Sequence, residues 1–162
     1  MGLDQYLYVE KHVSRKNYDK KVGDGYDFAN NEAFDEIISI LNAENAIDKD
    51  EWTGLTVKIP VGYWRKANAI HGWVVNNCGG GVDECQEITI SRIHAEALVD
   101  ICKIVLADNS KAQDLLPPTQ GFFFGGYDID EYYLDDLRRT ISIFEKALSD
   151  KTIDYLTYRA SW

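Results

Sequence analysis

Segments with a two-residue apolar period alternate along this chain with segments of helical period. The strand period covers residues 3–13, 55–61, 86–91 and 153–158. The helical period covers residues 31–46, 63–78, 92–107 and 131–148, with a further short helical turn at 111–116. This order indicates an α+β fold. We expect a single α+β domain over residues 1–162, in which about four helices pack on a small mixed sheet of three to five strands.

Two of the predicted strands carry signals for their position in the sheet. In residues 3–13, Leu3 and Leu7 alternate with Tyr6 and Tyr8, so large side chains lie on both faces and we expect an interior strand. Pro60 lies near the end of the second strand, which favours an edge position or a strand terminus because proline has no N–H to donate. Residues 14–31 are polar and lack a period, so we expect a surface loop there.

The predicted helix of residues 63–78 is the strongest candidate for a functional site. Its apolar stripe consists of Tyr63, Ala67, Ile70 and Val74. A second row, at steps of three and four residues, consists of Trp64, Asn68, His71 and Val75. This row brings an indole, an amide and an imidazole onto one helix face, and all three groups form hydrogen bonds. The pattern therefore predicts one wall of a polar pocket.

With Arg65 and Trp73 added, the candidate ligand-binding residues are Trp64, Arg65, Asn68, His71 and Trp73. An arginine flanked by indoles can hold a phosphate, a nucleobase or a carboxylate. The helix therefore predicts binding of a small anionic or nucleotide-like ligand, or of a host protein. The alternative is a structural helix, in which the aromatic rings pack in the core and the amide and imidazole satisfy neighbouring backbone groups.

Catalysis is a second hypothesis for the same residues, and the sequence leaves open whether the protein is an enzyme. His71 would be the general acid or base, while Asn68 and Arg65 would polarise or hold an anionic group. Cys78 follows His71 by seven residues on the predicted helix, which permits a Cys–His pair but supplies no group to orient it. A catalytic His71 must point into an open cleft.

The sequence predicts no metal and no other cofactor. The soft ligands His71, Cys78, Cys85 and His94 include no Cys-x-x-Cys pair. An acidic cluster, defined here as Asp128, Asp130, Glu131, Asp135 and Asp136, surrounds the start of the last long helix. Carboxylates at this position suit the helix dipole, and the spacing lacks the glycine and terminal glutamate of a calcium loop. Whether the acidic cluster binds a metal stays open at this point.

Charge and cysteine content restrict the partner and the compartment. The 27 acidic and 17 basic residues give a net charge of −10, which argues against direct binding to nucleic acid and to anionic lipid. An acidic nucleic-acid mimic that blocks a basic host protein is a further hypothesis. No apolar run approaches the roughly 20 residues of a membrane span. An odd number of cysteines and the lack of a signal peptide predict a cytoplasmic protein, or host cytoplasm if a phage encodes it.

Four motifs distributed over nearly the whole chain resemble a family of small uncharacterised proteins of bacteriophages and bacteria. They are residues 1–8 (MGLDQYLY), 63–73 (YWRKANAIHGW), 121–125 (GFFFG) and the final Ser161-Trp162. The chain departs from the family pattern at Gln5, where methionine is usual, and at Ala160, where serine is usual. The resemblance implies no established activity. It suggests a phage accessory protein as the source.

Overall fold

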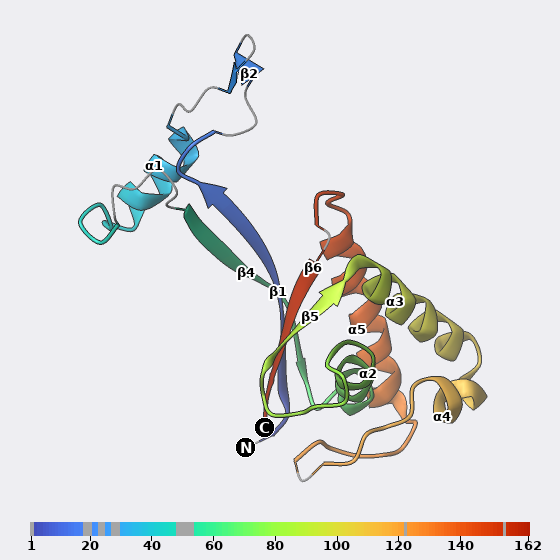
Figure 1. Ribbon diagram of the computed structural model, residues 1–162. Coiled ribbons are helices and arrows are strands. Elements are labelled where there is room, and N and C mark those ends of the chain that lie inside the picture. The colour runs from blue at the N-terminus through green and yellow to red at the C-terminus, as the bar shows by residue number, and fades with distance from the viewer. Residues whose placement is uncertain are drawn as a thin grey trace. The chain divides into compact units, whose positions relative to one another are not determined.

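Four strands form the main sheet of the computed structural model, which describes residues 2–17, 21–22, 25–26, 30–47, 54–121, 123–153 and 155–162 (Figure 1). The strands are β1 (Asp4–Ser14), β2 (Lys21–Val22), β3 (Gly25–Tyr26), β4 (Gly54–Arg65), β5 (Glu87–Ser91) and β6 (Tyr155–Ser161). The helices are α1 (Glu32–Ile40), α2 (Asn68–Cys78), α3 (Arg92–Ala107), the 3-10 turn η1 (Asn109–Lys111), α4 (Ala112–Leu115) and α5 (Glu131–Leu148). The predicted α+β class is confirmed.

The chain divides into two compact units. Unit 1 consists of Met1–Val9 and Ile59–Trp162, and unit 2 of Glu10–Lys58. Strands β1 and β4 each continue from one unit into the other, so the boundary is not a linker. The expectation of a single domain over residues 1–162 stays a prediction. Every residue discussed below as part of a site belongs to unit 1.

The main sheet has the strand order β4-β1-β6-β5. β1 pairs antiparallel with β6, with Asp4 opposite Ser161, and β5 pairs antiparallel with β6, with Ser91 opposite Tyr155. The interior position predicted for β1 is confirmed. Of the two positions that Pro60 favoured, a sheet edge and a strand end, the structure has the edge, because β4 is an edge strand and continues to Arg65. The sheet therefore places the first and last strands of the chain side by side at its centre.

In unit 1, helices α2, α3 and α5 cover one face of the sheet (Figure 1). The side chains that point toward them alternate along the strands, as the two-residue period predicts. They include Leu7 on β1, Ile90 on β5 and Leu156 on β6, all buried. Leu98 of α3 and Leu137 of α5 contribute fully buried side chains to the same core. One buried residue on the inner face, Gln5 of β1, is polar and must form hydrogen bonds there.

Side-chain caps mark the starts of three helices. Side-chain oxygens of Asn31, Ser91 and Asp130 accept hydrogen bonds from the first turns of α1, α3 and α5. Helix α2 ends at Cys78, and the two glycines after its C-cap have left-handed backbone conformations, with φ of 65° at Gly80 and 77° at Gly81. None of the helices in the described ranges is both long enough and apolar enough to cross a membrane.

The start of the predicted helix at residue 63 is wrong. Strand β4 continues through Arg65, and α2 begins only at Asn68. Alternation explains the difference: Trp64 is buried while Tyr63 and Arg65 are exposed, and aromatic residues fit a strand as well as a helix. Tyr63 is therefore not part of an apolar helix stripe, whereas Ala67, Ile70 and Val74 are buried as expected.

Smaller differences concern unit 2. Helix α1 ends at Ile40, before the predicted end near residue 46. Strands β2 and β3 form a short antiparallel pair within residues 14–31, where a loop without regular structure was expected. The acidic turn predicted at residues 48–51 lies outside the described residues.

Candidate functional site

The junction between β4 and α2 has an unusual backbone conformation. Lys66 is a non-glycine residue with φ of 62°, in the left-handed region, which costs about 1 kcal/mol. Two hydrogen bonds hold it there: its N–H donates to the carbonyl of Leu3 at 2.8 Å, and its carbonyl accepts from the N–H of Asn68 at 2.8 Å. The turn lets the chain pass from the edge strand into α2 within two residues, and it places Lys66 beside the loop that contains Gly125.

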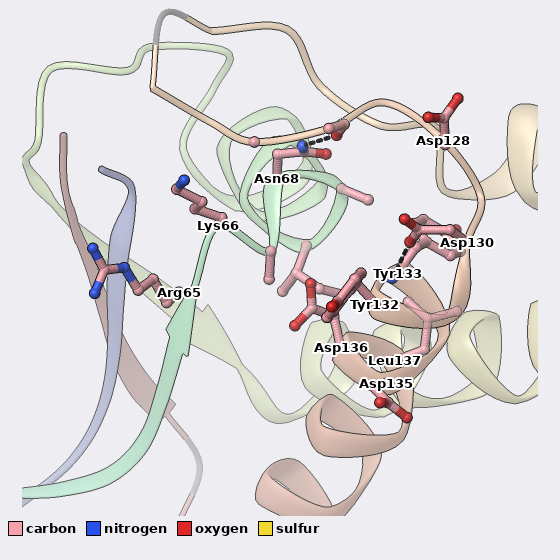
Figure 2. Close-up of a pocket in the computed structure, with 15 residues that line it drawn as sticks. Arg65, Lys66, Asn68, Asp128, Asp130, Tyr132, Tyr133, Asp135, Asp136 and Leu137 are labelled. Atoms are coloured by element: carbon pink, nitrogen blue, oxygen red, sulfur yellow. Dashed lines mark hydrogen bonds between the residues drawn. The ribbon is translucent and has the colours of Figure 1, made fainter. Parts of the chain in front are cut away.

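A cleft of about 360 Å³ opens between this junction and the first turns of α5 (Figure 2). Lys66 and Asn68 lie on one wall, residues 125–128 border it, and Asp136 and Tyr132 of α5 lie on the other wall. The backbone around Gly125 approaches Lys66 closely, because a Cβ at Gly125 would lie 3.2 Å from the Lys66 Cβ. Arg65 also borders the cleft, but Figure 2 shows its guanidinium pointing away from the aspartates.

Two of the four aspartates at the cleft already have structural roles. The carboxylate of Asp130 caps α5 by accepting from the N–H of Tyr133 at 3.0 Å. Asp135 accepts from Arg138, which also pairs with Glu131. Within the described residues, the carboxylate of Asp136 accepts no hydrogen bond, and Lys66 forms no ion pair. Lys66 and Asp136 therefore line one cleft without forming an ion pair with each other, and Figure 2 shows the Lys66 amine directed away from the aspartates.

The environment of Asp136 changes its acidity. Partial burial raises the pKa of Asp136 to about 6, and the neighbouring carboxylates of Asp135 and Asp130 add to the rise, while Arg139 opposes it. A carboxyl group with this pKa is mostly ionised at pH 7 and becomes neutral in mild acid. Perturbed acidity inside a cleft is typical of functional sites, although structural burial produces it as well.

Trp64, predicted to line the pocket, belongs to the core instead. Its indole Nε1 donates to Thr140 Oγ1 at 2.9 Å, and its ring packs 6.1 Å from that of Phe144. Both partners are on α5, so Trp64 attaches the end of β4 to that helix. Its side chain is buried and has no surface to offer a ligand. Trp73 is half-buried and packs against the same core.

Asn68 lines the cleft, but its amide is fully occupied. The Nδ2 group donates to the carbonyls of Phe124 and Gly126, at 3.1 and 2.8 Å, and Oδ1 accepts from the N–H of Thr119 at 3.1 Å. These bonds fasten both ends of the loop of residues 119–126 to the first turn of α2. Asn68 therefore shapes the cleft by holding its border rather than by contacting a ligand.

His71 is buried, and both ring nitrogens have partners. Nδ1 lies 2.8 Å from Tyr158 Oη and Nε2 lies 2.9 Å from Asp83 Oδ2. Phe124 packs edge-on to the ring at 5.2 Å. This is the geometry of a residue held in place. It does not match the open cleft that the catalytic hypothesis requires, and that hypothesis stays a prediction without support from the ring's surroundings.

Gln5 fixes the direction of the hydrogen bonds around His71. Its amide oxygen accepts from the Ala67 N–H at 3.0 Å, and its nitrogen donates to the Ala67 carbonyl at 3.3 Å and to Tyr158 Oη at 3.2 Å. Tyr158 then donates its own proton to His71 Nδ1, so the ring proton is on Nε2 and points to Asp83. Burial, with a smaller contribution from Asp83, holds the pKa of Tyr158 well above its usual value, which keeps this hydroxyl protonated.

The structure thus separates the predicted site residues. Arg65 and Asn68 border the cleft, His71 and the base of α2 border a second cavity, and Trp64 and Trp73 pack in the core. Lys66, Tyr132 and Asp136 are the residues that the prediction left out of the site. The acidic cluster gave a signal for Asp136, but only the tertiary fold brings α5 against the β4–α2 junction.

Metal binding and thiol chemistry gain no support from the geometry. No group of three or more His, Cys, Asp or Glu side chains is arranged to hold a metal within the described part of the chain. Burial raises the pKa of Cys78 to about 11 and that of Cys102 to about 12. Both thiols are therefore protonated near neutral pH, which makes them poor nucleophiles.

Comparison with known proteins adds no function to the residues at the cleft. The predicted resemblance to a phage and bacterial family stays a prediction. No family model, curated protein or solved structure matches this chain.

Proposed function

We propose that the protein binds a small zwitterionic ligand in the cleft between Lys66 and Asp136. The observation that carries the proposal is a cavity of about 360 Å³ that both Lys66 and Asp136 line, with no ion pair joining the two side chains. Figure 2 shows the Lys66 amine pointing away from Asp136, so binding requires this long side chain to turn toward the ligand. A ligand with an anionic group and a protonated amine would complete both interactions at once. Among the small anionic ligands expected from the sequence, the proposal selects those that also have a protonated amine.

The lining favours a short ligand that carries both charges. Lys66 suits a carboxylate or a phosphate, while Asp136 and Asp128 suit an ammonium group. Ile70 and Leu137 add apolar surface, and Tyr132 is exposed at the side of the cleft, where its ring can cover a bound molecule (Figure 2). Amino acids and amino phosphates have this arrangement of charges. A polyanionic nucleotide fits less well, because the aspartates would repel its phosphates.

The backbone of Lys66 supports the same proposal. Left-handed conformations of non-glycine residues cluster at ligand sites, where the surrounding structure maintains the strain. A glycine would adopt this φ without cost, yet the chain has a lysine at the position. A charged side chain that contributes to binding gives a reason for the strained residue.

Calorimetry or ligand-observed NMR with a panel of amino acids and amino phosphates at pH 7.5 tests the proposal. We expect at least one panel member to bind, and Lys66→Met and Asp136→Asn each to weaken its binding about tenfold, since each removes one charge contact. Lys146→Met, which alters an exposed lysine at the far end of α5, is the matched control and should bind as the wild type does. A panel without any binder, or equal binding by all variants, would contradict the proposal.

The wider biological setting belongs to the proposal too. A phage or bacterial accessory protein in the cytoplasm would use such a cleft to sense or sequester a small metabolite of the host. The alternative of an acidic nucleic-acid mimic has less support, because Asp128, Asp130, Asp135 and Asp136 border a concave cleft and Arg138 neutralises part of the cluster.

A further inference from the structure

A second cavity, of about 310 Å³, is bordered by residues 119–121, 123 and 124 and shares no lining residue with the Lys66–Asp136 cleft. Its base is the buried face of α2 around Gly72 and Val75, and its walls are Phe123, Phe124 and Trp162. Apolar surface therefore dominates, and the amides of Asn76 and Gln120 lie at the rim. The proposed function makes no use of this cavity.

Two glycines allow the walls to come close together. A Cβ at Gly72 would lie 1.8 Å from Thr119 Oγ1, so the loop rests directly on the backbone of α2. A Cβ at Gly121 would lie 2.4 Å from the ring of Phe124. Asn68 fastens the same loop through its bonds to Thr119 and Phe124. The cavity is thus formed by a loop that three separate contacts hold in place.

The aromatic wall is oriented by a chain of buried hydrogen bonds. Trp162 is about half exposed, yet its Nε1 donates to Asp83 Oδ1 at 3.2 Å and its ring packs 6.1 Å from Phe124. Asp83 in turn accepts from the buried His71, which Tyr158 holds from the other side. Because the Trp162 indole is half exposed, fixing it with these hydrogen bonds adds little to the stability of the fold. A fixed aromatic surface does, however, reduce the entropy cost of binding a ring.

We infer that this cavity binds a nucleobase or an uncharged nucleoside, with the ring packed against Trp162 and Phe123. Stacking on an aromatic side chain stabilises a bound base and tolerates any of the four bases, because every base has a π-face. Asn76 and Gln120 have no hydrogen-bond partner among the described residues, and an amide offers a donor and an acceptor that match a base edge. The carboxylate of Asp83 and the net charge of −10 disfavour a phosphate here.

Calorimetry with adenosine, guanosine, cytidine and uridine tests this inference, with AMP and a short single-stranded oligonucleotide as charged probes. We expect at least one nucleoside to bind, and both charged probes to bind more weakly than the corresponding nucleoside. Trp162→Ala should weaken nucleoside binding by about tenfold, from the loss of stacking. Asn76→Ala should weaken it less and change the preference among the four nucleosides, because the amide reads the base edge.

Tyr132→Ala is the matched control, because it removes an exposed aromatic ring from the other cleft and should leave nucleoside binding unchanged. Trp162→Phe keeps an aromatic ring and should retain more affinity than Trp162→Ala, which separates stacking from a folding defect. Three results would overturn the inference: no nucleoside binds, Trp162→Ala binds as the wild type does, or AMP or the oligonucleotide binds at least as tightly as the nucleoside. Failure of the amino acid panel has no bearing on this result, since the two cavities are lined by different residues.

Discussion

At the scale of single residues, Asp136 has the most informative environment. A carboxyl group whose pKa is raised to about 6 in the folded protein binds a proton more readily there than in the unfolded chain, where the pKa is about 4. Between these two values the folded state holds more protons than the unfolded state. The contribution of Asp136 to stability therefore improves as the pH falls from about 6 to about 4, and above pH 6 its buried charge is unfavourable.

Asp136→Asn should remove this dependence. At pH 7.5 we expect the variant to be more stable than the wild type by roughly 1 kcal/mol, after discounting for the partial exposure of the carboxyl group. The advantage should shrink as the pH approaches 4. Urea unfolding at a series of pH values measures it, and Asp114→Asn, an exposed aspartate of α4, is the control. A stability difference that does not change with pH would contradict the assignment.

At the scale of elements, the β4–α2 junction determines where the cleft lies. The strand continues through Arg65, one left-handed residue follows at Lys66, and α2 begins at Asn68. The side chain of Trp64 attaches the strand to α5 through Thr140, and Asn68 attaches the helix to the loop of residues 119–126. Lys66 lies between these two attachments, so the surrounding contacts maintain its strained conformation.

Two substitutions of Lys66 test whether its left-handed backbone conformation is strained. We expect Lys66→Gly to be more stable than Lys66→Ala by about 1 kcal/mol, because only glycine adopts a φ of 62° without a steric cost. Thermal unfolding of the two variants measures the difference. Both should lose binding of the zwitterionic ligand to a similar extent, since both lack the ammonium group. Greater stability of the alanine variant would contradict the left-handed conformation.

At the scale of the molecule, unit 1 is connected internally by a buried polar chain that links its first and last strands. The chain of contacts runs from Gln5 on β1 through Tyr158 on β6 to His71 on α2, and from there to Asp83 and Trp162. The buried members of this chain form hydrogen bonds with one another. Among the described residues, no buried side-chain nitrogen or oxygen lacks a hydrogen-bond partner. Loss of one member therefore leaves others unsatisfied.

Tyr158→Phe tests the energetic importance of this network. The substitution removes only the hydroxyl group, and leaves His71 Nδ1 and the Gln5 amide without their shared partner, so we expect a loss of about 1–3 kcal/mol in the free energy of unfolding. Tyr155→Phe is the matched control, because Tyr155 is on the same strand but exposed, and it should change stability by less than about 0.5 kcal/mol. Chemical denaturation measures both, and equal effects would argue against a buried network.

The sequence by itself determined the α+β class, the order of the main elements and the interior position of β1, and for β4 it favoured an edge position or a strand end. These features depend on local patterns: the period of apolar residues, large side chains on both faces of a strand, and a proline that cannot donate a hydrogen bond. The pattern failed at residues 63–67, where Tyr63 and Trp64 fit a strand and a helix equally well. Packing of Trp64 against Phe144 and Thr140 of α5 decided between the two. Both contacts are long-range: Thr140 is 76 positions from Trp64 in the sequence, and Phe144 is farther still.

The candidate site depended on tertiary structure to a greater degree. The sequence indicated the right region of the chain and noted the acidic cluster, but it placed Trp64 on one helix face with Asn68, His71 and Val75 and added Arg65, whereas Trp64 and Arg65 belong to β4. Only the folded chain brings Lys66 and Asp136 to one cleft, and only the approach of β6 to α2 gives His71 its partner Tyr158. The physical reason is that a local period specifies which face of an element is apolar, whereas the neighbours of a polar side chain are set by how separate elements pack.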